Sequence, residues 1–545
     1  MSPRGDAHGV ATGARESAWT AEPFRLGTVD QFARVRELFV RAGFEETPIC
    51  ARAGIASLHE LPVLEDRSAF REPGDAQSLF VRLFLDCDPI PWTVARTTLP
   101  AADLAALEVL GLVHAAHDDP AMCVSTVAIY PLEELFIASD RQHSFDSTAS
   151  VPPSDLVFSP MTRETQRFLR LMPRESCDHL LDLCTGTGVA GLIAAAKFAR
   201  RVTLVDVAAR SVRFAEFNVA LNGLSNVRVL RGDVYEPVAG ERFSAIIAHP
   251  PYVPALETEF VFRDAGLDGE QVTRKVIAGL GAHLGVGGQF FCECMLTERA
   301  GVTLEERIRE MLGDARDEVD LVIAQGRSTN PLHYLSDQAR AGYSSFDSLA
   351  QWSEILDEQK IEQLVFVSLL MERRANARPV ITTRRALSPL TSAADMQWVL
   401  RWMVGTASWD MADMRRLLSS RPRTLPRTEL RSRSLLQEGQ WGVEECQLVT
   451  LAPFAVEAAC PNWYATLLQF CDGRMTAREH LQYLRDTHAV PDTAPEDLFA
   501  SMIRQLVDAG LVEIEEFRLP DATAMREEAG VRERAAGNTP VERAD

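Results

Sequence analysis

The sequence predicts a multidomain chain built around a doubly wound α/β domain of seven strands, with a winged-helix-like module on each side. Three observations support this prediction. The chain has 545 residues, 46% of them hydrophobic, so it is too long for one ordinary core and apolar enough for several. Short apolar runs alternate with helical patterns from about residue 154 to 374. On either side, helical patterns end in short extended runs.

Residues 21–150 are expected to form the first module, which is mostly helical. Helices followed by a small hairpin are typical of a winged helix. Because no helix here is strongly basic, contact with protein or substrate is favoured over the reading of DNA. Helices are predicted over 32–40, 77–85 and, after the start signal Pro100, over 101–110; extended runs are predicted over 112–115 and 122–130.

Residues 151–375 are expected to form the central domain. Helical patterns separate its early strands, which implies a parallel sheet covered on both faces. The stretch from Arg327 to Gln359 is long for a connection between the last two strands, so it is interpreted as an inserted lid or substrate wall. The strands are predicted at 179–183, 202–206, 227–230, 243–248, 289–294, 319–323 and 364–368.

The C-terminal third is expected to hold a linker and a second module. Residues 376–429 are interpreted as a linker with helices, because its first part is rich in Pro and Arg. Residues 430–520 follow the order helix, Asp-Gly turn, helix, helix and strand, which again indicates a winged-helix-like fold. Residues 521–545 are polar and are expected to be disordered.

Composition excludes several classes of function. The formal net charge of -21 disfavours general adhesion to nucleic acid or to an acidic membrane. The ten cysteines lack metal-ligand spacing, so reduced thiols and no metal site are expected. Neither a signal-peptide core nor an apolar run of about 18 residues is visible, which predicts a cytoplasmic protein without a membrane span.

The strongest motif runs from Asp182 to Gly191, at the end of the first strand of the central domain, and reads Asp-Leu-Cys-Thr-Gly-Thr-Gly-Val-Ala-Gly. Glycines at such a turn let the backbone approach a ligand and place amide donors beside it. The spacing Gly-x-Gly-x-x-Gly is also the dinucleotide fingerprint, and Asp206 ends the next strand where a ribose acceptor lies in that fold.

Three carboxylates favour S-adenosylmethionine over a dinucleotide. Asp182 suits an amino group, Asp206 accepts from ribose hydroxyls, and Asp233, after the third strand, accepts from the adenine amine. S-adenosylmethionine carries these groups and lacks a pyrophosphate. A second motif, Ala248-His-Pro-Pro-Tyr-Val-Pro254, follows the fourth strand at the edge where such sheets bind ligands.

These segments resemble the successive motifs of class I S-adenosylmethionine-dependent methyltransferases over about residues 154–375. The resemblance rests on Asp-Leu-Cys-Thr-Gly-Thr-Gly, Val-Asp-Val-Ala, Ala-Leu-Asn-Gly-Leu and Gly-Asp-Val. It is nearest to the protein glutamine N5-methyltransferases and the related small-domain enzymes that methylate RNA guanine or adenine. It implies a Rossmann-like core with S-adenosylmethionine as cofactor. Cys184 departs from these families, which usually have glycine there.

The same resemblance implies the roles of the site residues. His-Pro-Pro-Tyr is similar to the Asn/Asp-Pro-Pro-Tyr motif, whose first side chain and a following carbonyl accept hydrogen bonds from the nitrogen to be methylated, while its tyrosine stacks on the acceptor. Phe262-Arg-Asp-Ala-Gly resembles a segment of some members of this group. Arg263, Asp264 and Asp268 are expected to order the loop over the acceptor, and a solvated turn with an internal ion pair is the alternative. Catalytic roles thus go to His249, Pro250 and Tyr252, acceptor contacts to Pro251, Tyr252, Arg263 and Asp264, and cofactor contacts to Asp182, Cys184, Thr185, Gly186, Gly188, Asp206, Val207, Asp233, Val234 and His249.

His249 leaves the acceptor atom open. A neutral imidazole has one acceptor nitrogen and replaces the asparagine oxygen only in the correct tautomer. With an ordinary pKa near ~6.5 it is equally suited to act as a general base. Methylation of a nitrogen in a protein, peptide or biosynthetic intermediate is expected. The alternatives are N-methylation of rRNA or DNA bases, O-methylation of a small natural product with His249 as base, and a binding protein that senses the cofactor through a dead site.

The last module resembles the small winged-helix domains that recruit precursor peptides in ribosomal peptide modification. The resemblance rests on residues 467–476 and on the closing Gly510-Leu-Val. It implies that a leader peptide pairs with an exposed sheet edge. A structural role or dimerisation is the alternative.

Overall fold

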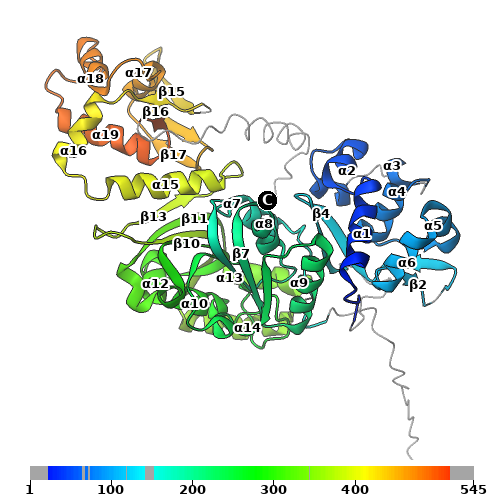
Figure 1. The fold of residues 1–545 in the computed structure, drawn as a ribbon. Helices are drawn as coiled ribbons and strands as arrows, with labels where there is room; N and C mark the ends of the chain where they lie inside the picture. Colours follow the sequence, from blue (N-terminus) through cyan, green and yellow to red (C-terminus); the bar gives the residue numbers. More distant parts are fainter. Residues whose placement is uncertain are drawn as a thin grey trace, which may run out of the picture.

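The computed structural model describes residues 22–63, 68–71, 74–117, 119–141, 153–342, 344–426 and 428–515. The expected disordered tail, 521–545, lies outside the described residues. Figure 1 shows three parts: N-terminal helices in blue, a central sheet in green with helices around it, and a yellow-to-orange C-terminal module. None of the described helices has both the length and the apolar character needed to cross a membrane.

The central sheet has eight strands in the described part of the chain, in the order β13-β11-β12-β10-β9-β6-β7-β8. All seven predicted strands are present, and the eighth is an addition. The strands are β6 (Cys177–Leu183), β7 (Ala199–Asp206), β8 (Val227–Arg231), β9 (Phe243–Ala248), β10 (Leu284–Arg299), β11 (Val319–Thr329), β12 (Ile361–Arg373) and β13 (Thr382–Ala386).

The centre of the sheet is parallel, as predicted, and one strand departs from this direction. β12 runs antiparallel to both of its neighbours, β10 and β11, while the other pairs are parallel. A long insertion joins β11 to β12 and holds α13 (Pro331–Arg340) and α14 (Leu349–Glu358). Because β12 begins at the edge where its antiparallel neighbour β11 ends, this insertion lies at the edge where the parallel strands end.

Helices lie on both faces of the sheet, as a doubly wound fold requires (Figure 1). Leu192 and Ile193 of α8 belong to one buried cluster, and Ile277 of α10 and Ile308 of α12 belong to a second cluster that includes other strand residues. The helices are α7 (Arg163–Leu171), α8 (Val189–Lys197), α9 (Ala209–Asn222), α10 (Gln271–Ala278), α11 (Leu280–His283) and α12 (Leu304–Met311).

The region predicted as a linker is partly built into the central domain, which corrects that boundary. β13, at residues 382–386, pairs in parallel with β11. The helix that follows, α15 (Ala393–Thr406), lies on the central domain, where the Gln397 and Gln289 side chains hydrogen-bond to each other. The indole of Trp402 on α15 donates to Asp508 of the last module. This helix therefore joins the two parts.

The N-terminal part packs on α9. Ala138 of β5 (Leu135–Asp140) exchanges hydrogen bonds of 2.8 and 2.9 Å with the side chain of Asn218 on α9. The predicted run 122–130 divides into two strands, and its second half pairs with β5. The other elements are α1 (Val29–Arg41), α2 (Glu46–Ala53), α3 (Ser68–Arg71), α4 (Ala76–Phe80), a π-helical turn (Val81–Leu85), β1 (Ile90–Pro91), α5 (Trp92–Thr98), α6 (Ala101–Val109), β2 (His114–Ala115), β3 (Met122–Val124) and β4 (Val127–Leu132).

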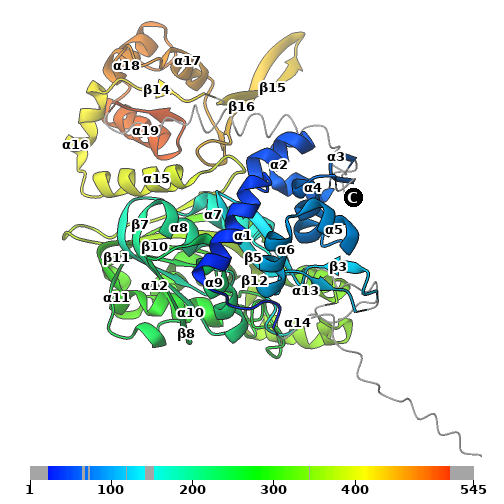
Figure 2. The ribbon, with the colours of Figure 1, turned by 45° about the vertical axis from the view of Figure 1, so that its right-hand side comes forward.

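The C-terminal module has the predicted order of helix, turn, helix, helix and strand, with Gly473 in the turn at φ +83°. A hairpin of β15 (Glu429–Gln437) and β16 (Gln440–Thr450) projects from it (Figure 2). The winged-helix character of both outer modules stays a prediction. The other elements are α16 (Met411–Arg416), β14 (Arg423–Thr424), β17 (Val456–Ala459), α17 (Trp463–Phe470), α18 (Ala477–Asp486), α19 (Glu496–Asp508) and β18 (Val512–Glu513).

Candidate functional site

A cavity of about 650 Å³ lies at the carboxyl ends of the parallel strands and is the candidate site. Both motifs open into it. Of the residues that the sequence assigns to the site, all but Gly188 line this cavity: Asp182, Cys184, Thr185, Gly186, Asp206, Val207, Asp233, Val234, His249, Pro250, Pro251, Tyr252, Arg263 and Asp264.

The glycine-rich turn after β6 runs through the left-handed region of backbone space. Cys184, Gly186 and Gly188 have φ values of +56°, +55° and +82°. A Cβ at Gly186 would meet no atom within 4 Å, whereas one at Gly188 would lie 3.1 Å from the side chain of Leu204. Gly188 therefore lets the turn pack against β7 and begin α8. It does not line the cavity, and its contact with a cofactor stays a prediction.

Asp182 lies one residue before the end of β6 and places a buried carboxylate beside the cavity. Its Oδ2 accepts from the Thr185 hydroxyl at 2.7 Å and from the Gly191 amide at 3.0 Å. Burial raises the pKa of Asp182 to about 7, even though these two donors lower it. These hydrogen bonds leave Oδ1 free to receive a donor from the cavity.

Asp206 ends β7 in a similar environment. Oδ2 accepts from the Gly186 amide and Oδ1 from the Ala208 amide, both at 2.9 Å. Burial raises the pKa of this carboxyl as well. Among the described residues, no arginine or lysine forms an ion pair with Asp182 or Asp206. Two buried carboxylates that face a cavity and are paired with no arginine or lysine of the described residues fit a ligand bearing an ammonium group and a ribose diol, as S-adenosylmethionine does.

The next part of the cavity suits a flat base. Val207 follows β7 and is 49% exposed, and Val234 lines the same cavity after β8. Asp233 lies beside Val234, where Lys275 of α10 donates to its Oδ2 at 2.6 Å. An adenine amine that bonds to Asp233 would thus share this carboxylate with Lys275.

The His249 turn follows β9 directly. Because β9 pairs in parallel with β6, this turn lies next to the end of β6, at the same edge of the sheet. The imidazole stacks on Phe168 of α7, with ring centroids 5.3 Å apart, and on Tyr252, with centroids 5.9 Å apart. Burial, together with the nearby Arg167 guanidinium, lowers the pKa of His249 to about 4. His249 is therefore neutral near pH 7.

Two arginines flank an aromatic ring behind this turn. Tyr252 meets Phe366 of β12 edge-on at 6.0 Å, and the guanidinium carbons of Arg167 and Arg327 each lie 5.6 Å from the centre of the Phe366 ring. Arg167 pairs with Glu293, a buried residue of β10. Burial raises the pKa of Glu293 to about 7.

Arg263 and Asp264 order the loop after the His249 turn, as the sequence suggested. Asp264 Oδ2 accepts from the amides of residues 259 and 260 at 2.9 and 2.8 Å. Arg263 donates to Asp264 Oδ1 at 2.8 Å and to Gln338 of α13 at 2.9 Å. The loop is thus bound to the insertion, and the contact of these two residues with an acceptor stays a prediction.

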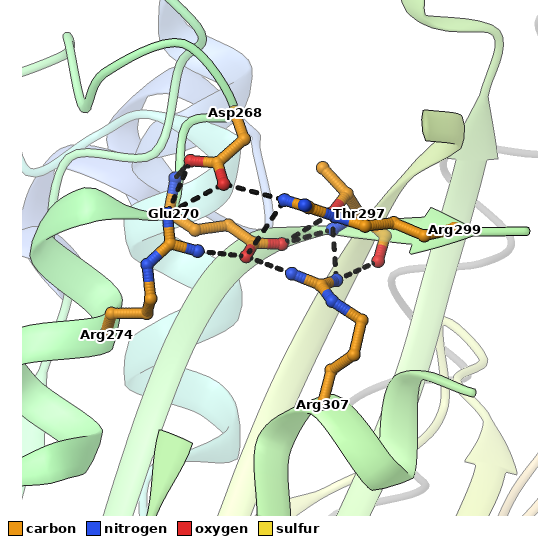
Figure 3. A network of polar contacts seen from close by, with 6 residues as sticks. All are labelled: Asp268, Glu270, Arg274, Thr297, Arg299 and Arg307. Carbon is orange, nitrogen blue, oxygen red and sulfur yellow. Dashed lines mark hydrogen bonds and ion pairs between the residues drawn. The ribbon is translucent and has the colours of Figure 1, made fainter. Parts of the chain in front are cut away.

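A buried ion network lies beneath the loop (Figure 3). The Glu270 side chain is fully buried and accepts from Arg274 at 2.8 Å, from Arg307, and from the amide and hydroxyl of Thr297 at 2.7 and 2.8 Å. Asp268 pairs with both Arg274 and Arg299 at 2.7 Å. The network fixes the end of the loop to β10 and α12, so Asp268 has a structural role.

Sequence reasoning missed the wall opposite the two motifs. Phe168, Phe366, Tyr334 and Arg327 line the cavity from three separate parts of the chain. Only the unusual length of the segment 327–359 pointed to part of this wall. Phe158 also lines the cavity and stacks on Phe262 with centroids 5.4 Å apart.

Comparison with known proteins agrees with this geometry. Residues 157–310 match the family described as methyltransferase small domain. The ribosomal protein uL3 glutamine methyltransferase of Bradyrhizobium diazoefficiens is 34% identical over 129 residues, which cover 21% of this chain and 40% of the relative. A putative protein N5-glutamine methyltransferase of Methanocaldococcus jannaschii is 33% identical over 116 residues, or 20% of this chain and 57% of the relative.

A third relative is the release factor glutamine methyltransferase of Xylella fastidiosa, which is 30% identical over 139 residues, 24% of this chain and 50% of the relative. The chain thus spans about half the length of these curated relatives. The family match at residues 157–310 includes both the glycine-rich turn and the His249 turn.

Proposed function

We propose that the protein is an S-adenosylmethionine-dependent methyltransferase that transfers a methyl group to a nitrogen of a protein, a peptide or a biosynthetic intermediate. One observation carries the proposal: Asp182, Asp206, Asp233 and the His249 turn all line the same cavity at the carboxyl edge of the sheet. The match to the methyltransferase small domain and the three glutamine methyltransferase relatives support it.

The cofactor would be held by the first motif. Asp182 would receive the amino group, Asp206 the ribose hydroxyls, and Asp233 the adenine amine, with Val207 and Val234 beside the base. When bound, S-adenosylmethionine supplies an electrophilic methyl group on a sulfonium. Gly186 keeps the wall open next to the nucleoside, because the space that a side chain would fill there is free.

The protein's part in catalysis is to orient the acceptor. A neutral His249 offers one ring nitrogen as a hydrogen-bond acceptor for an N–H of the substrate, in place of the asparagine oxygen. Tyr252 would stack on a flat acceptor group, and Pro250 and Pro251 restrict the backbone between them. Orientation of this kind brings the lone pair of the nitrogen into line with the methyl group.

The lowered pKa favours transfer to nitrogen over general-base O-methylation. A base works best when its pKa lies near the working pH. Because the pKa of His249 is about 4, its imidazole is a weak acceptor for the proton of a hydroxyl at neutral pH. An amide nitrogen that is oriented by hydrogen bonds does not need His249 to take up a proton; it needs only an acceptor nitrogen on the neutral ring.

The charges of the cavity disfavour a nucleic-acid acceptor. Its wall carries three cationic side chains, those of Arg263, Lys275 and Arg327. The acidic side chains are twice as many: Asp155, Glu164, Asp182, Asp206, Asp233 and Asp264. A basic cleft that would attract a phosphate backbone is therefore not present at this site.

Recruitment of a peptide by the C-terminal module is the second part of the proposal. It rests on the resemblance of that module to peptide-recruiting domains and on the protein acceptors named for the relatives. Deleting the module but keeping α15 would expose Trp402, which donates to Asp508 of the module. A test should therefore use the full chain and measure whether candidate leader peptides bind to it.

The test of the function is turnover with deuteromethyl-labelled S-adenosylmethionine, followed by mass spectrometry of candidate proteins and peptides. We expect label on a side-chain nitrogen with the wild type and none with His249→Ala, while calorimetry shows that the variant still binds S-adenosylhomocysteine. If the wild type binds the cofactor and labels neither acceptor class, the chain is a cofactor sensor with a dead site.

A further inference from the structure

The acceptor end of the cavity holds one cation without a counter-charge. Of the three cationic side chains in the wall, Arg263 pairs with Asp264 at 2.8 Å and Lys275 with Asp233 at 2.6 Å. Arg327, at the end of β11, forms neither an ion pair nor a hydrogen bond within the described ranges; its recorded contact is with the Phe366 ring. Its five N–H donors are therefore available to a ligand.

Two arginines with different surroundings lie over the Phe366 ring. Arg167 lies over this ring and pairs with the buried Glu293. Arg327 lies over it at the same distance, 5.6 Å, and is exposed at the rim of the cavity. Stacking fixes the plane of the guanidinium and reduces the entropy that it would lose on binding an anion.

A continuous row of aromatic contacts joins Arg327 to the reacting end. His249 stacks on Tyr252 at 5.9 Å, and Tyr252 meets Phe366 at 6.0 Å. Tyr334 of the α13 insertion meets Phe366 from another direction at 6.5 Å. A substrate whose flat group lies by His249 and Tyr252 would extend along this row toward Arg327.

We propose that Arg327 binds an oxyanion of the methyl acceptor, which is a carboxylate or a phosphate a few bonds away from the nitrogen to be methylated. This rests on the proposed function, because it takes the His249 turn as the reacting end. A guanidinium forms bidentate hydrogen bonds with such an anion, and these are stronger than bonds between neutral groups. Arg327 is then the residue that selects anionic acceptors over neutral ones.

Glu164 should oppose the binding of an anion, so its substitution provides a control with the opposite expected effect. Its carboxylate lines the same end of the cavity, has no ion pair among the described residues, and interacts electrostatically with Tyr334, as Arg327 and Arg263 do. Removing the charge of Glu164 should tighten the binding of an anion, while removing that of Arg327 should weaken it.

The test uses the full chain saturated with S-adenosylhomocysteine and two probes that share a side-chain amide. N-acetylglutamine has a free carboxylate, and N-acetylglutaminamide is neutral. We expect the wild type to bind the acid roughly tenfold or more tightly than the amide. Arg327→Met should reduce this ratio to within about twofold, and Glu164→Gln should raise it. Arg340→Met on α13 is the matched control, because Arg340 pairs with Asp337 and does not line the cavity.

The outcomes separate the two proposals. Equal binding of acid and amide by the wild type, or a preference that survives Arg327→Met, overturns the anion site. Inorganic phosphate that competes with the acid in the wild type but not in Arg327→Met supports the site and assigns it to a phosphate group. If the wild type does not bind S-adenosylhomocysteine at all, that result would instead contradict the proposed function.

Discussion

Replacing Asp206 by alanine should abolish useful binding of the cofactor. Both carboxylate oxygens of Asp206 are already oriented by backbone amides, those of Gly186 and Ala208, each at 2.9 Å. In the proposed complex they also accept from the two ribose hydroxyls. A hydrogen bond to a charged group contributes about 1.5–3 kcal/mol, so losing two costs about 3–6 kcal/mol. That free energy corresponds to a roughly 10²- to 10⁴-fold rise in Kd.

The assay is calorimetric titration of S-adenosylhomocysteine into the wild type, Asp206→Ala and Asp206→Asn. The asparagine variant keeps an acceptor oxygen for one amide and loses the charge, so its Kd should fall between the other two. Asp178→Ala is the matched control. Asp178 lies on β6, pairs with Arg200 and Arg201, and is not part of the cavity wall. Its affinity should be that of the wild type.

A thermal melt of each variant separates lost binding from lost folding. If Asp206→Ala has a cooperative transition and still binds within about twofold of the wild type, the ribose is not held by this carboxylate. The assignment of the glycine-rich turn to S-adenosylmethionine would then be wrong.

Three further results are expected. Burial raises the pKa of Asp182 to about 7, so its carboxylate becomes protonated as the pH falls through this value. The affinity for S-adenosylhomocysteine should therefore weaken between pH 7 and about pH 5, which titrations across this range check. Asp182→Asn should show a weaker dependence, because Asp206, whose pKa burial also raises, is still present. Gly191→Ala would bring a Cβ to 2.2 Å from Leu204, so urea unfolding should show a loss of about 1–3 kcal/mol, and a wild-type midpoint would contradict the close packing of α8 on β7. Glu270→Gln removes the charge at the centre of the buried network and should cost about 3–5 kcal/mol by urea unfolding, whereas Glu444→Gln, in an exposed pair, should change little.

The central fold was predictable because each of its predicted strands is marked by a short, local pattern in the sequence. Each predicted run is short and apolar, and each appears as a strand of the sheet. β13 was missed because Thr-Thr-Arg-Arg-Ala has almost no apolar residues, which an edge strand does not need. The antiparallel direction of β12 was missed for another reason. It depends on where the insertion of α13 and α14 begins and ends, and composition does not carry that information.

The candidate site likewise has residues that the sequence could predict and residues that it could not. The glycine-rich turn and the His249 turn are contiguous motifs, so their residues could be predicted and all but Gly188 line the cavity. Phe168, Phe366 and Arg327 come from α7, β12 and β11, and none of them belongs to a motif. The lowered pKa of His249 was equally beyond the sequence, because it depends on burial and on Arg167 of α7.

A crystal structure of the full chain with S-adenosylhomocysteine is the most direct test of the central claim, which is that one nucleoside binds across three carboxylates with its sulfur toward the His249 turn. We predict the ribose diol on Asp206, the amino group on Asp182, the adenine beside Val207 and Val234, and the sulfur facing His249. A ligand bound outside this cavity, or one whose sulfur points away from His249, would contradict the account.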